Sequence, residues 1–324
     1  MPGSNQTPPR IEEFIIIGFP GFRDTDSQTT IFGSLLAIYI CILLGNLLIV
    51  IIFLHDKNLH SPMYILITNL ALTDILVSSA TVPKLLSILR SGSGVISFAA
   101  CFLQMFSYYS MTNVESFLLV LMAYDRYLAI CNPLHYVTLT SNSLVLRQIG
   151  WCWACAFLIV IVPLSPSVAL AFCGSNIVNH FFCDHSALLK LACSDTTINN
   201  YAGLCLVICV LIFPLLCILF SYTKVIISVL RISSNDGRLK AFSTCSTQLM
   251  VIAIFFLVAS GVYISNRVPN TSADVRIFAA LIQTILPPLM NPIIYCIRNA
   301  EIREKMSRKT SPCICSAIHF LYCG

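Results

Sequence analysis

Charged residues are scarce in this chain of 324 residues. Lys, Arg, Asp and Glu make up 10% of it, whereas 57% of the residues are hydrophobic. A soluble domain usually carries about 25% charged residues, so these charges are too few to cover a surface that faces water. We therefore expect the chain to be solvated by a lipid bilayer. Its formal charge of +5 is too small to indicate nucleic-acid binding.

Several enzyme and transporter signatures are also missing. The sequence has no protease-like GxGD, no zinc-binding HExxH and no nucleophile GxSxG motif. No internal repeat relates its two halves, as an inverted-repeat transporter would require. The missing motifs predict that the protein is not an enzyme. The missing repeat makes a transporter or channel a weaker hypothesis.

What the sequence does contain is seven apolar segments of about 20 residues or more, the length that a membrane-spanning helix needs. They lie near 30–54, 62–88, 98–130, 145–170, 201–230, 241–264 and 273–297. The chain is therefore expected to be an all-α membrane protein, a seven-transmembrane helix bundle in residues 30–297. Residues 1–29 would form an amino-terminal segment and residues 298–324 a tail.

Lysine and arginine are unevenly distributed between the two sides of this predicted bundle. The loops after the first, third and fifth spans, with the tail, hold most of them. By the positive-inside rule, the amino terminus is extracellular and the tail cytosolic. We expect residues 298–309 to form a short amphipathic helix on the inner leaflet or, as the alternative, a disordered basic tail. Cys313 and Cys315 follow this segment and are candidates for palmitoylation.

Two features agree with this orientation. Asn5 begins an "NQT" glycosylation acceptor on the predicted outer side. Four of the cysteines also fall on that oxidising side, where disulfides form, and four cysteines allow three pairings. These are Cys101, Cys173, Cys183 and Cys193.

An adjacent acid and base, Asp125 and Arg126, interrupt the end of the third span. The face that carries Arg126 runs back along the helix to Cys101, a rise of about 37 Å. One helix could thus connect an outer pocket with an inner switch in which the acid holds the arginine in one rotamer and releases it when protonated or repelled. The alternative is that both side chains simply extend to the membrane interface.

Two acids, Asp74 and Glu115, fall near the middle of the second and third spans. A carboxylate at that depth is costly unless it is paired, hydrated or protonated. With Asn46 and Asn291 at similar depth, these groups could surround a sodium ion, since a hard cation takes oxygen ligands. The alternatives are a pair of acids that share a proton and a purely structural polar cluster.

The stretch "MAYDRYLAICNPLHY" resembles the end of the third helix in the olfactory receptors, within the rhodopsin-like G-protein-coupled receptors. Other motifs agree in order: Gly45–Asn46, Leu59–Tyr64, "LALTD" ending at Asp74, Ser221–Tyr222, Lys240–Gln248 and Pro287–Tyr295. The resemblance extends from about residue 40 to residue 298. It implies a plasma-membrane odorant receptor that activates a heterotrimeric G protein of the olfactory stimulatory type.

The resemblance also assigns roles to particular residues. It implies that Arg126 holds the inactive state and meets the G protein on activation, and that the disulfides are Cys101–Cys183 and Cys173–Cys193. The residues expected in coupling and switching are Asp125, Arg126, Tyr127, Tyr222, Lys240, Asn291, Pro292 and Tyr295. The sequence departs from the family at Gln248, where His is usual, and in lacking a proline near Val258, which leaves the bend of the sixth helix unexplained.

The outer part of the third span offers polar and aromatic side chains but no acid, which argues against an amine held by a salt bridge. We expect a mostly apolar ligand pocket with a few hydrogen bonds, although some of its residues could be ordinary bundle contacts. The predicted pocket consists of Met105, Tyr108, Tyr109, Thr112, Asn113, His180, Tyr263 and Arg267.

Arg267, at the outer end of the sixth span, has two interpretations. It could face lipid headgroups, or it could bind a carboxylate bidentately. Together with "NHFFCDHS" (Asn179–Ser186), it resembles the fish-like branch of olfactory receptors, which would make carboxylic or amino acids plausible ligands. The rival function is a rhodopsin-like receptor for a non-odorant peptide or lipid. No cofactor is expected beyond the possible sodium ion.

Overall fold

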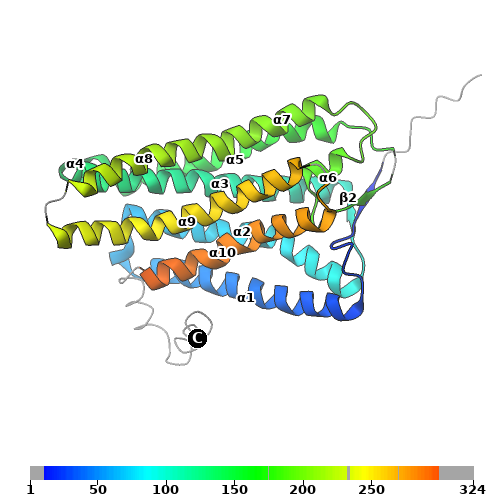
Figure 1. Cartoon of the computed structure of the whole chain (residues 1–324), viewed down its shortest axis with the longest axis horizontal. Helices are drawn as coiled ribbons and strands as arrows, with labels where there is room; N and C mark the ends of the chain where they lie inside the picture. The colour runs from blue at the N-terminus through cyan, green and yellow to red at the C-terminus, as the bar shows by residue number, and fades with distance from the viewer. Residues whose placement is uncertain (1–10, 174, 232–233, 269, 299–324) are drawn as a thin grey trace, which may run out of the picture.

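The computed structural model describes residues 11–173, 175–231, 234–268 and 270–298. Over these residues the chain forms an elongated bundle of long helices lying side by side (Figure 1). Its elements are β1 (Glu13–Ile16), α1 (Thr25–His55), η1 (Lys57–Leu59), α2 (Pro62–Ser91), β2 (Val95–Ser97), α3 (Phe98–Cys131), α4 (Pro133–Leu139), α5 (Asn142–Val168), β3 (Ile177–Val178), α6 (His185–Leu189), α7 (Thr197–Val207), η2 (Ile208–Ile212), α8 (Phe213–Leu230), α9 (Asn235–Arg267) and α10 (Ala273–Arg298).

The seven predicted spans are confirmed as α1, α2, α3, α5, the continuous segment α7–η2–α8, α9 and α10. In the described part of the chain, six of these are long and apolar enough by composition to cross a membrane, and α3 is the exception. Polar side chains between Tyr108 and Ser116 lower its hydropathy. These side chains are mostly buried among the surrounding helices, so protein rather than lipid solvates α3.

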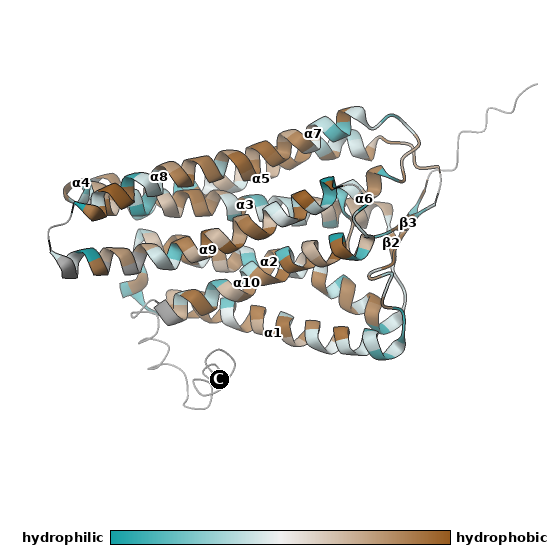
Figure 2. Cartoon of the chain, viewed as in Figure 1, coloured by the Kyte–Doolittle hydropathy of each residue, from teal (hydrophilic) through white to brown (hydrophobic). Residues whose placement is uncertain are grey.

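Apolar side chains cover the outside of the bundle as well as its core. Leu44, Trp151, Phe220 and Leu257 are each 60% exposed or more, on four different helices. Hydrophobic colouring runs along the helices, and hydrophilic residues gather towards their ends (Figure 2). An apolar outer surface of this kind is stable in hydrocarbon, as the sequence predicts.

Local capping explains where the helices begin and end. Asp24 accepts a hydrogen bond of 2.8 Å from the backbone N–H of Ser27 and so starts α1, earlier than the predicted residue 30. Ser97 caps α3 in the same way, through the N–H of Ala100. Gly92 ends α2 with φ of 68°, a left-handed conformation that favours glycine.

The segment before the first span is not only a polar terminus, because it contributes a strand. β1 pairs antiparallel with β2 and parallel with β3, in the order β2-β1-β3. Its alternation buries Phe14 and Ile16. Gly94 lies so close to the carbonyl of Ile16 that a Cβ there would collide with it. This small sheet is an addition to the predicted all-α architecture.

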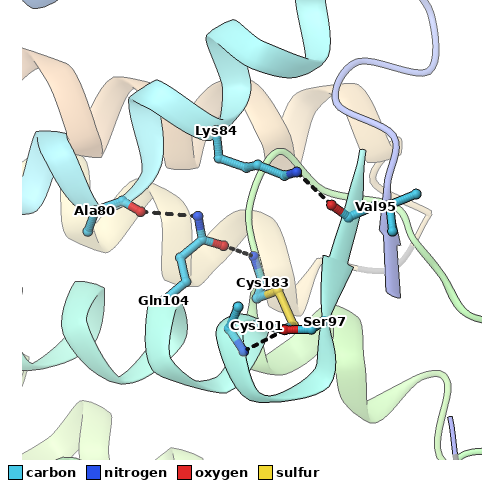
Figure 3. Close-up of a disulfide and its surroundings, with 8 residues drawn as sticks. Ala80, Lys84, Val95, Ser97, Cys101, Gln104 and Cys183 are labelled. Carbon is cyan, nitrogen blue, oxygen red and sulfur yellow. Dashed lines mark hydrogen bonds between the residues drawn. A yellow bond between two sulfur atoms is a disulfide. The ribbon is translucent and has the colours of Figure 1, made fainter. Parts of the chain in front are cut away.

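Both predicted disulfides are confirmed. Cys101–Cys183 ties the loop after α5 to the start of α3, and Cys173–Cys193 closes that loop on itself. Beside the first disulfide, Gln104 donates to the carbonyl of Ala80 and accepts from the N–H of Cys183, each at 3.1 Å (Figure 3). We call the end of the bundle with the sheet and disulfides the outer end, and the opposite end, with α4, the inner end.

Candidate functional site

A cavity of about 180 Å³ opens among the outer parts of α3, α7, α9 and α10, next to the disulfide-bonded loop. It is lined by Tyr108, Tyr109, Thr112, Asn113, His180, Phe182, Asp184, Leu206, Val207, Val210, Leu211, Phe255, Ala259, Val262, Tyr263, Asn266, Ala280 and Gln283. Most of the wall is aliphatic or aromatic, with a few polar groups, the usual composition of a small-molecule site.

The structure brings most of the predicted pocket residues to this cavity: Tyr108, Tyr109, Thr112, Asn113, His180 and Tyr263. Met105 does not line this cavity, because it lies one turn nearer the disulfide and is fully buried in an apolar cluster with Phe102, Val160 and Cys183. Arg267 does not line the cavity either. Its side chain is exposed, and the guanidinium lies 5.4 Å from the ring centroid of Tyr263 instead of in the cavity.

The cavity wall includes a π-helical turn, η2, whose origin lies in Pro214. Proline has no N–H, so it cannot donate to the carbonyl of Val210 four residues earlier. The hydroxyl of Ser116 on α3 donates to that carbonyl instead, at 2.6 Å. Val210 and Leu211 of this turn both line the cavity, so a bond from α3 supports the backbone that shapes the site.

The outer loop contributes an acid that the sequence analysis did not assign to the pocket. Asp184 accepts hydrogen bonds from the hydroxyl of Tyr109 at 2.7 Å, the hydroxyl of Ser186 at 2.5 Å and the N–H of Ala187 at 3.0 Å. Burial opposes ionisation, but the neighbouring His180 and these hydrogen bonds hold the pKa of the Asp184 carboxyl below its ordinary value. Asp184 therefore stays ionised, with its oxygens already occupied.

His180 packs beside Phe181 and Phe182 in the same loop, with ring centroids 5.0 and 4.7 Å away. Burial lowers the pKa of its imidazole despite the nearby Asp184 charge. The disulfide explains why the loop residues meet the cavity. Cys183 is fastened to α3, so Phe182 and Asp184 on either side of it must lie over that helix. The cysteine pairing was the signal that could have identified them.

A second polar group lies deeper in the bundle. Nδ2 of Asn291 donates to both carboxylate oxygens of Asp74, at 3.1 and 3.0 Å, and the carboxyl of Glu115 lies beside that of Asp74. The structure thus brings together three of the four residues predicted there.

Asn46, the fourth, points its amide donor elsewhere. Its Nδ2 donates to the carbonyl of Pro288 at 2.8 Å. Pro292 cannot donate to that carbonyl, which would otherwise be unpaired, because it lacks an N–H. Asn46 therefore binds a backbone carbonyl that a proline leaves unpaired in α10, as Ser116 does in the α7–η2–α8 segment. Its Oδ1 and Oε1 of Glu115 are both buried with no hydrogen-bond partner among the described residues.

At the inner end, the predicted contact between Asp125 and Arg126 is not made within the described ranges. Adjacent side chains on a helix point in different directions, and α4 presents a competing donor. The hydroxyl of Tyr136 donates to Oδ1 of Asp125 at 2.8 Å. Burial and the Asp125 charge raise the pKa of Tyr136, which keeps it a donor.

The charge of Arg126 acts on Tyr222 and Tyr295 as well as on Asp125. Within the described part of the chain, Nε of Arg126, the hydroxyl of Tyr222 and both amide atoms of Gln248 are buried without hydrogen-bond partners. The hydroxyl of Tyr295 reaches only the sulfur of Met122, at 4.0 Å. We call Arg126, Tyr222, Gln248 and Tyr295 the inner cluster.

The remaining predicted residues contribute less. Tyr127 is half-buried and stacks with Tyr124, and Lys240 lies near the start of α9. The glycosylation acceptor Asn5 lies outside the described residues, as do Cys313 and Cys315. Of the predicted amphipathic helix at residues 298–309, only residue 298 is described.

Comparisons with known proteins agree with this arrangement. A family model described as olfactory receptor matches residues 35–311. Olfactory receptor 1E1 of Pan troglodytes is 39% identical over 308 residues, which cover 95% of this chain and 96% of the relative. Olfactory receptor 10A7 of Homo sapiens is 40% identical over 299 residues, which cover 92% and 94%. These names do not distinguish a fish-like branch, so that assignment stays a prediction.

The fold is also found in a solved structure. A crystal structure of squid rhodopsin superposes with a TM-score of 0.74 at 18% identity, covering 91% of this chain and 90% of that one. The predicted multi-pass receptor fold is thus confirmed, as is the prediction that the protein is not an enzyme. With a family model that spans most of its length and relatives that align almost end to end, this chain belongs to the olfactory receptor family of G-protein-coupled receptors.

Proposed function

We propose that this receptor binds a small odorant in the outer cavity and passes the signal along α3 to the inner cluster, where a stimulatory heterotrimeric G protein docks. The observation that carries the proposal is the course of α3, which lines the cavity with Tyr109 and Asn113 and carries Arg126 near its inner end. The cavity volume of about 180 Å³ and its mostly apolar wall suit a small molecule.

The contacts between α3 and α10 support a route for the signal. Near the cavity, the hydroxyls of Tyr108 and Thr284 pair with each other at 3.3 Å. At mid-depth, Asn291 binds Asp74, and Glu115 lies beside it. At the inner end, Tyr295 meets Met122. A ligand that shifts α3 against α10 at the outer end changes contacts at all three depths, because packed helices move as units.

The mid-depth acids would hold a sodium ion in the inactive state. Asp74 and Glu115 supply charge, and the buried oxygens of Asn46 and Glu115 that lack partners fit a hard cation. No group of three or more His, Cys, Asp or Glu in the described ranges could hold a metal, so the amide oxygens of Asn46 and Asn291 would complete the set. The alternative is a proton shared by the two acids. The ion would neutralise two carboxylates that otherwise repel each other.

At the inner end, the unpaired groups suit a partner that supplies acceptors. The guanidinium of Arg126 carries five donors, and its Nε is unused within the described chain. A G protein inserted between α3 and α9 would present backbone carbonyls to Arg126 and widen the space around Tyr222 and Tyr295. Tyr127 on α3 and Lys240 on α9 would take part in the same contact.

The proposal is tested with Arg126→Ala. Cyclic AMP is measured in cells that co-express the olfactory stimulatory α subunit, together with surface labelling of the receptor. We expect normal surface delivery and a loss of ligand-stimulated cyclic AMP of at least about tenfold, because the receptor loses its main charged contact with the G protein. Tyr124→Phe, an exposed position on the same turn, serves as the matched control. A full response from Arg126→Ala at normal surface density would contradict the proposal.

A further inference from the structure

One polar side chain in the wall of the outer cavity has no partner of its own. Asn113 is only 2% exposed, and its Nδ2 makes no hydrogen bond to any described residue. It also lines the cavity, as do its neighbour Thr112 and residues of η2. A buried amide without a partner destabilises the empty receptor, and a ligand that supplies the missing acceptor recovers that loss.

The other buried hydroxyls and the acid of the wall are already engaged. Thr112 donates to the backbone carbonyl of Tyr108 at 3.0 Å. The hydroxyls of Tyr108 and Thr284 pair with each other at 3.3 Å, and because Thr284 gives its single proton to the carbonyl of Ala280 at 2.9 Å, Tyr108 is the donor in that pair. Tyr109 donates to Asp184, whose oxygens are shared with Ser186 and Ala187. An amine would have to displace these donors to reach Asp184. The remaining unpaired atom, Nδ1 of His180, lies in the aromatic stack of the loop.

The charge of the wall selects against anions. The described lining residues include no lysine or arginine, and the acid Asp184 is among them. His180 cannot compensate, because burial lowers its pKa and keeps it neutral near pH 7. Arg267 is exposed outside the cavity against Tyr263. A carboxylate that entered would lose its hydration and meet a like charge.

We propose that the cavity takes a neutral odorant with an acceptor oxygen on an apolar chain, an aldehyde, ketone or ester, and that Asn113 reads this oxygen by donating a hydrogen bond. The apolar chain lies against the aliphatic side chains of Leu206, Val207, Val210 and Leu211. This inference rests on the proposed function only in taking the outer cavity as the odorant site. It replaces the expectation of carboxylic or amino acids, which depended on Arg267.

The test uses the purified full-length receptor in lipid nanodiscs and a series matched in chain length: octanal, octane, octanoate and octylamine. Affinity is measured from the ligand-dependent rise in unfolding temperature, for wild type, Asn113→Leu and Asn113→Ser. Ser110→Ala is the matched control, since it removes from the same helix a buried hydroxyl that has no partner among the described residues and is not part of the cavity lining. Nucleotide exchange on an added stimulatory G protein is recorded on the same samples.

We expect wild type to prefer octanal to the other three. Asn113→Leu should lower octanal affinity about tenfold, leave octane unchanged and raise the unfolding temperature of the ligand-free receptor, because the unpaired amide is gone. Asn113→Ser, which keeps a polar group of smaller reach, should also lose octanal affinity. Ser110→Ala should keep it.

Several outcomes would overturn the inference. These are preference for octanoate or octylamine, an unchanged octanal affinity in both Asn113 variants, an equal loss in Ser110→Ala, or no binding of the series at saturation. The two proposals fail separately. Octanal binding that depends on Asn113 without nucleotide exchange would sink the proposed function alone, whereas ligand-driven exchange that ignores Asn113 would sink this inference alone.

Discussion

The two ends of the bundle are held in different ways. At the outer end, two disulfides, a three-stranded sheet and the Gln104 bridge fasten the loops to the helices. At the inner end, the described part of the chain has no cross-link, and polar groups of the inner cluster lack partners. The disulfides and the strand pairing make the outer cavity a preformed site. At the inner end, the buried polar groups without partners can form hydrogen bonds with a protein that docks there.

The same contrast appears in the hydrogen bonds that connect helices. Asp184 has three donors and fixes the loop to α3 through Tyr109. Asp125, at the other end of α3, has one donor, Tyr136, and its Oδ2 has no partner in the described ranges. Asp184 is thus held by several hydrogen bonds and Asp125 by one. Ligand recognition needs a rigid arrangement like that of Asp184, whereas switching needs a contact that breaks easily, like that of Asp125.

The largest expected effect is at the outer end. Cys101→Ser should abolish surface delivery, because opening the link across 82 residues removes about 4 kcal/mol of stability in the loop-entropy model. Surface labelling of intact cells measures it. Cys155→Ser, which removes an exposed cysteine that forms no disulfide, should be delivered normally. Normal delivery of Cys101→Ser would mean that the outer end does not depend on its cross-link.

A smaller effect is expected where α3 supports the cavity wall. Ser116→Ala leaves the carbonyl of Val210 unpaired and should cost about 1–3 kcal/mol, lowering both the unfolding temperature and ligand affinity. Ser110→Ala is the matched control, since its hydroxyl is buried on the same helix without a partner among the described residues. That control should be neutral or stabilising. Equal losses in the two variants would argue that the Ser116 bond is not what holds the η2 turn.

The smallest effect is expected at the tether of the inner end. Tyr136→Phe removes one hydrogen bond to Asp125, worth about 0.5–1.5 kcal/mol, and should raise basal G-protein activation up to about tenfold while ligand affinity stays unchanged. Basal cyclic AMP at matched surface density is the readout, with Tyr124→Phe as control. A change in ligand affinity without a change in basal activity would contradict the view that the Tyr136–Asp125 hydrogen bond restrains the inner end and leaves the outer cavity unaffected.

Much of the architecture was accessible from the sequence. Hydrophobic runs located all seven spans because length and apolarity are local properties. Tyr109, Thr112 and Asn113 were correctly placed at the cavity, since a helix fixes which residues share a face. Met105 shares that spacing but faces the disulfide cluster, because which neighbour covers each turn of a helix is not a local property.

Other features depended on segments that meet only in the folded chain. Asp125 bonds to Tyr136 because α4 folds back under α3. Asp184 joins the cavity because its loop is fastened to α3 by the neighbouring Cys183. β1 pairs with β2 and β3, which belong to two loops far from it in the sequence. None of these pairings has a periodic signal in the sequence.

Composition and hydrophobic periodicity by themselves determined the solvent, the number of spans and the residues that α3 offers to each end, because the bilayer demands helices whose backbone groups pair internally. The tertiary structure alone decided which polar groups are satisfied. Prolines on two helices leave carbonyls unpaired, and side chains from other helices, Ser116 and Asn46, bind them. Asn113, in the wall of the cavity, receives no such partner from the described residues.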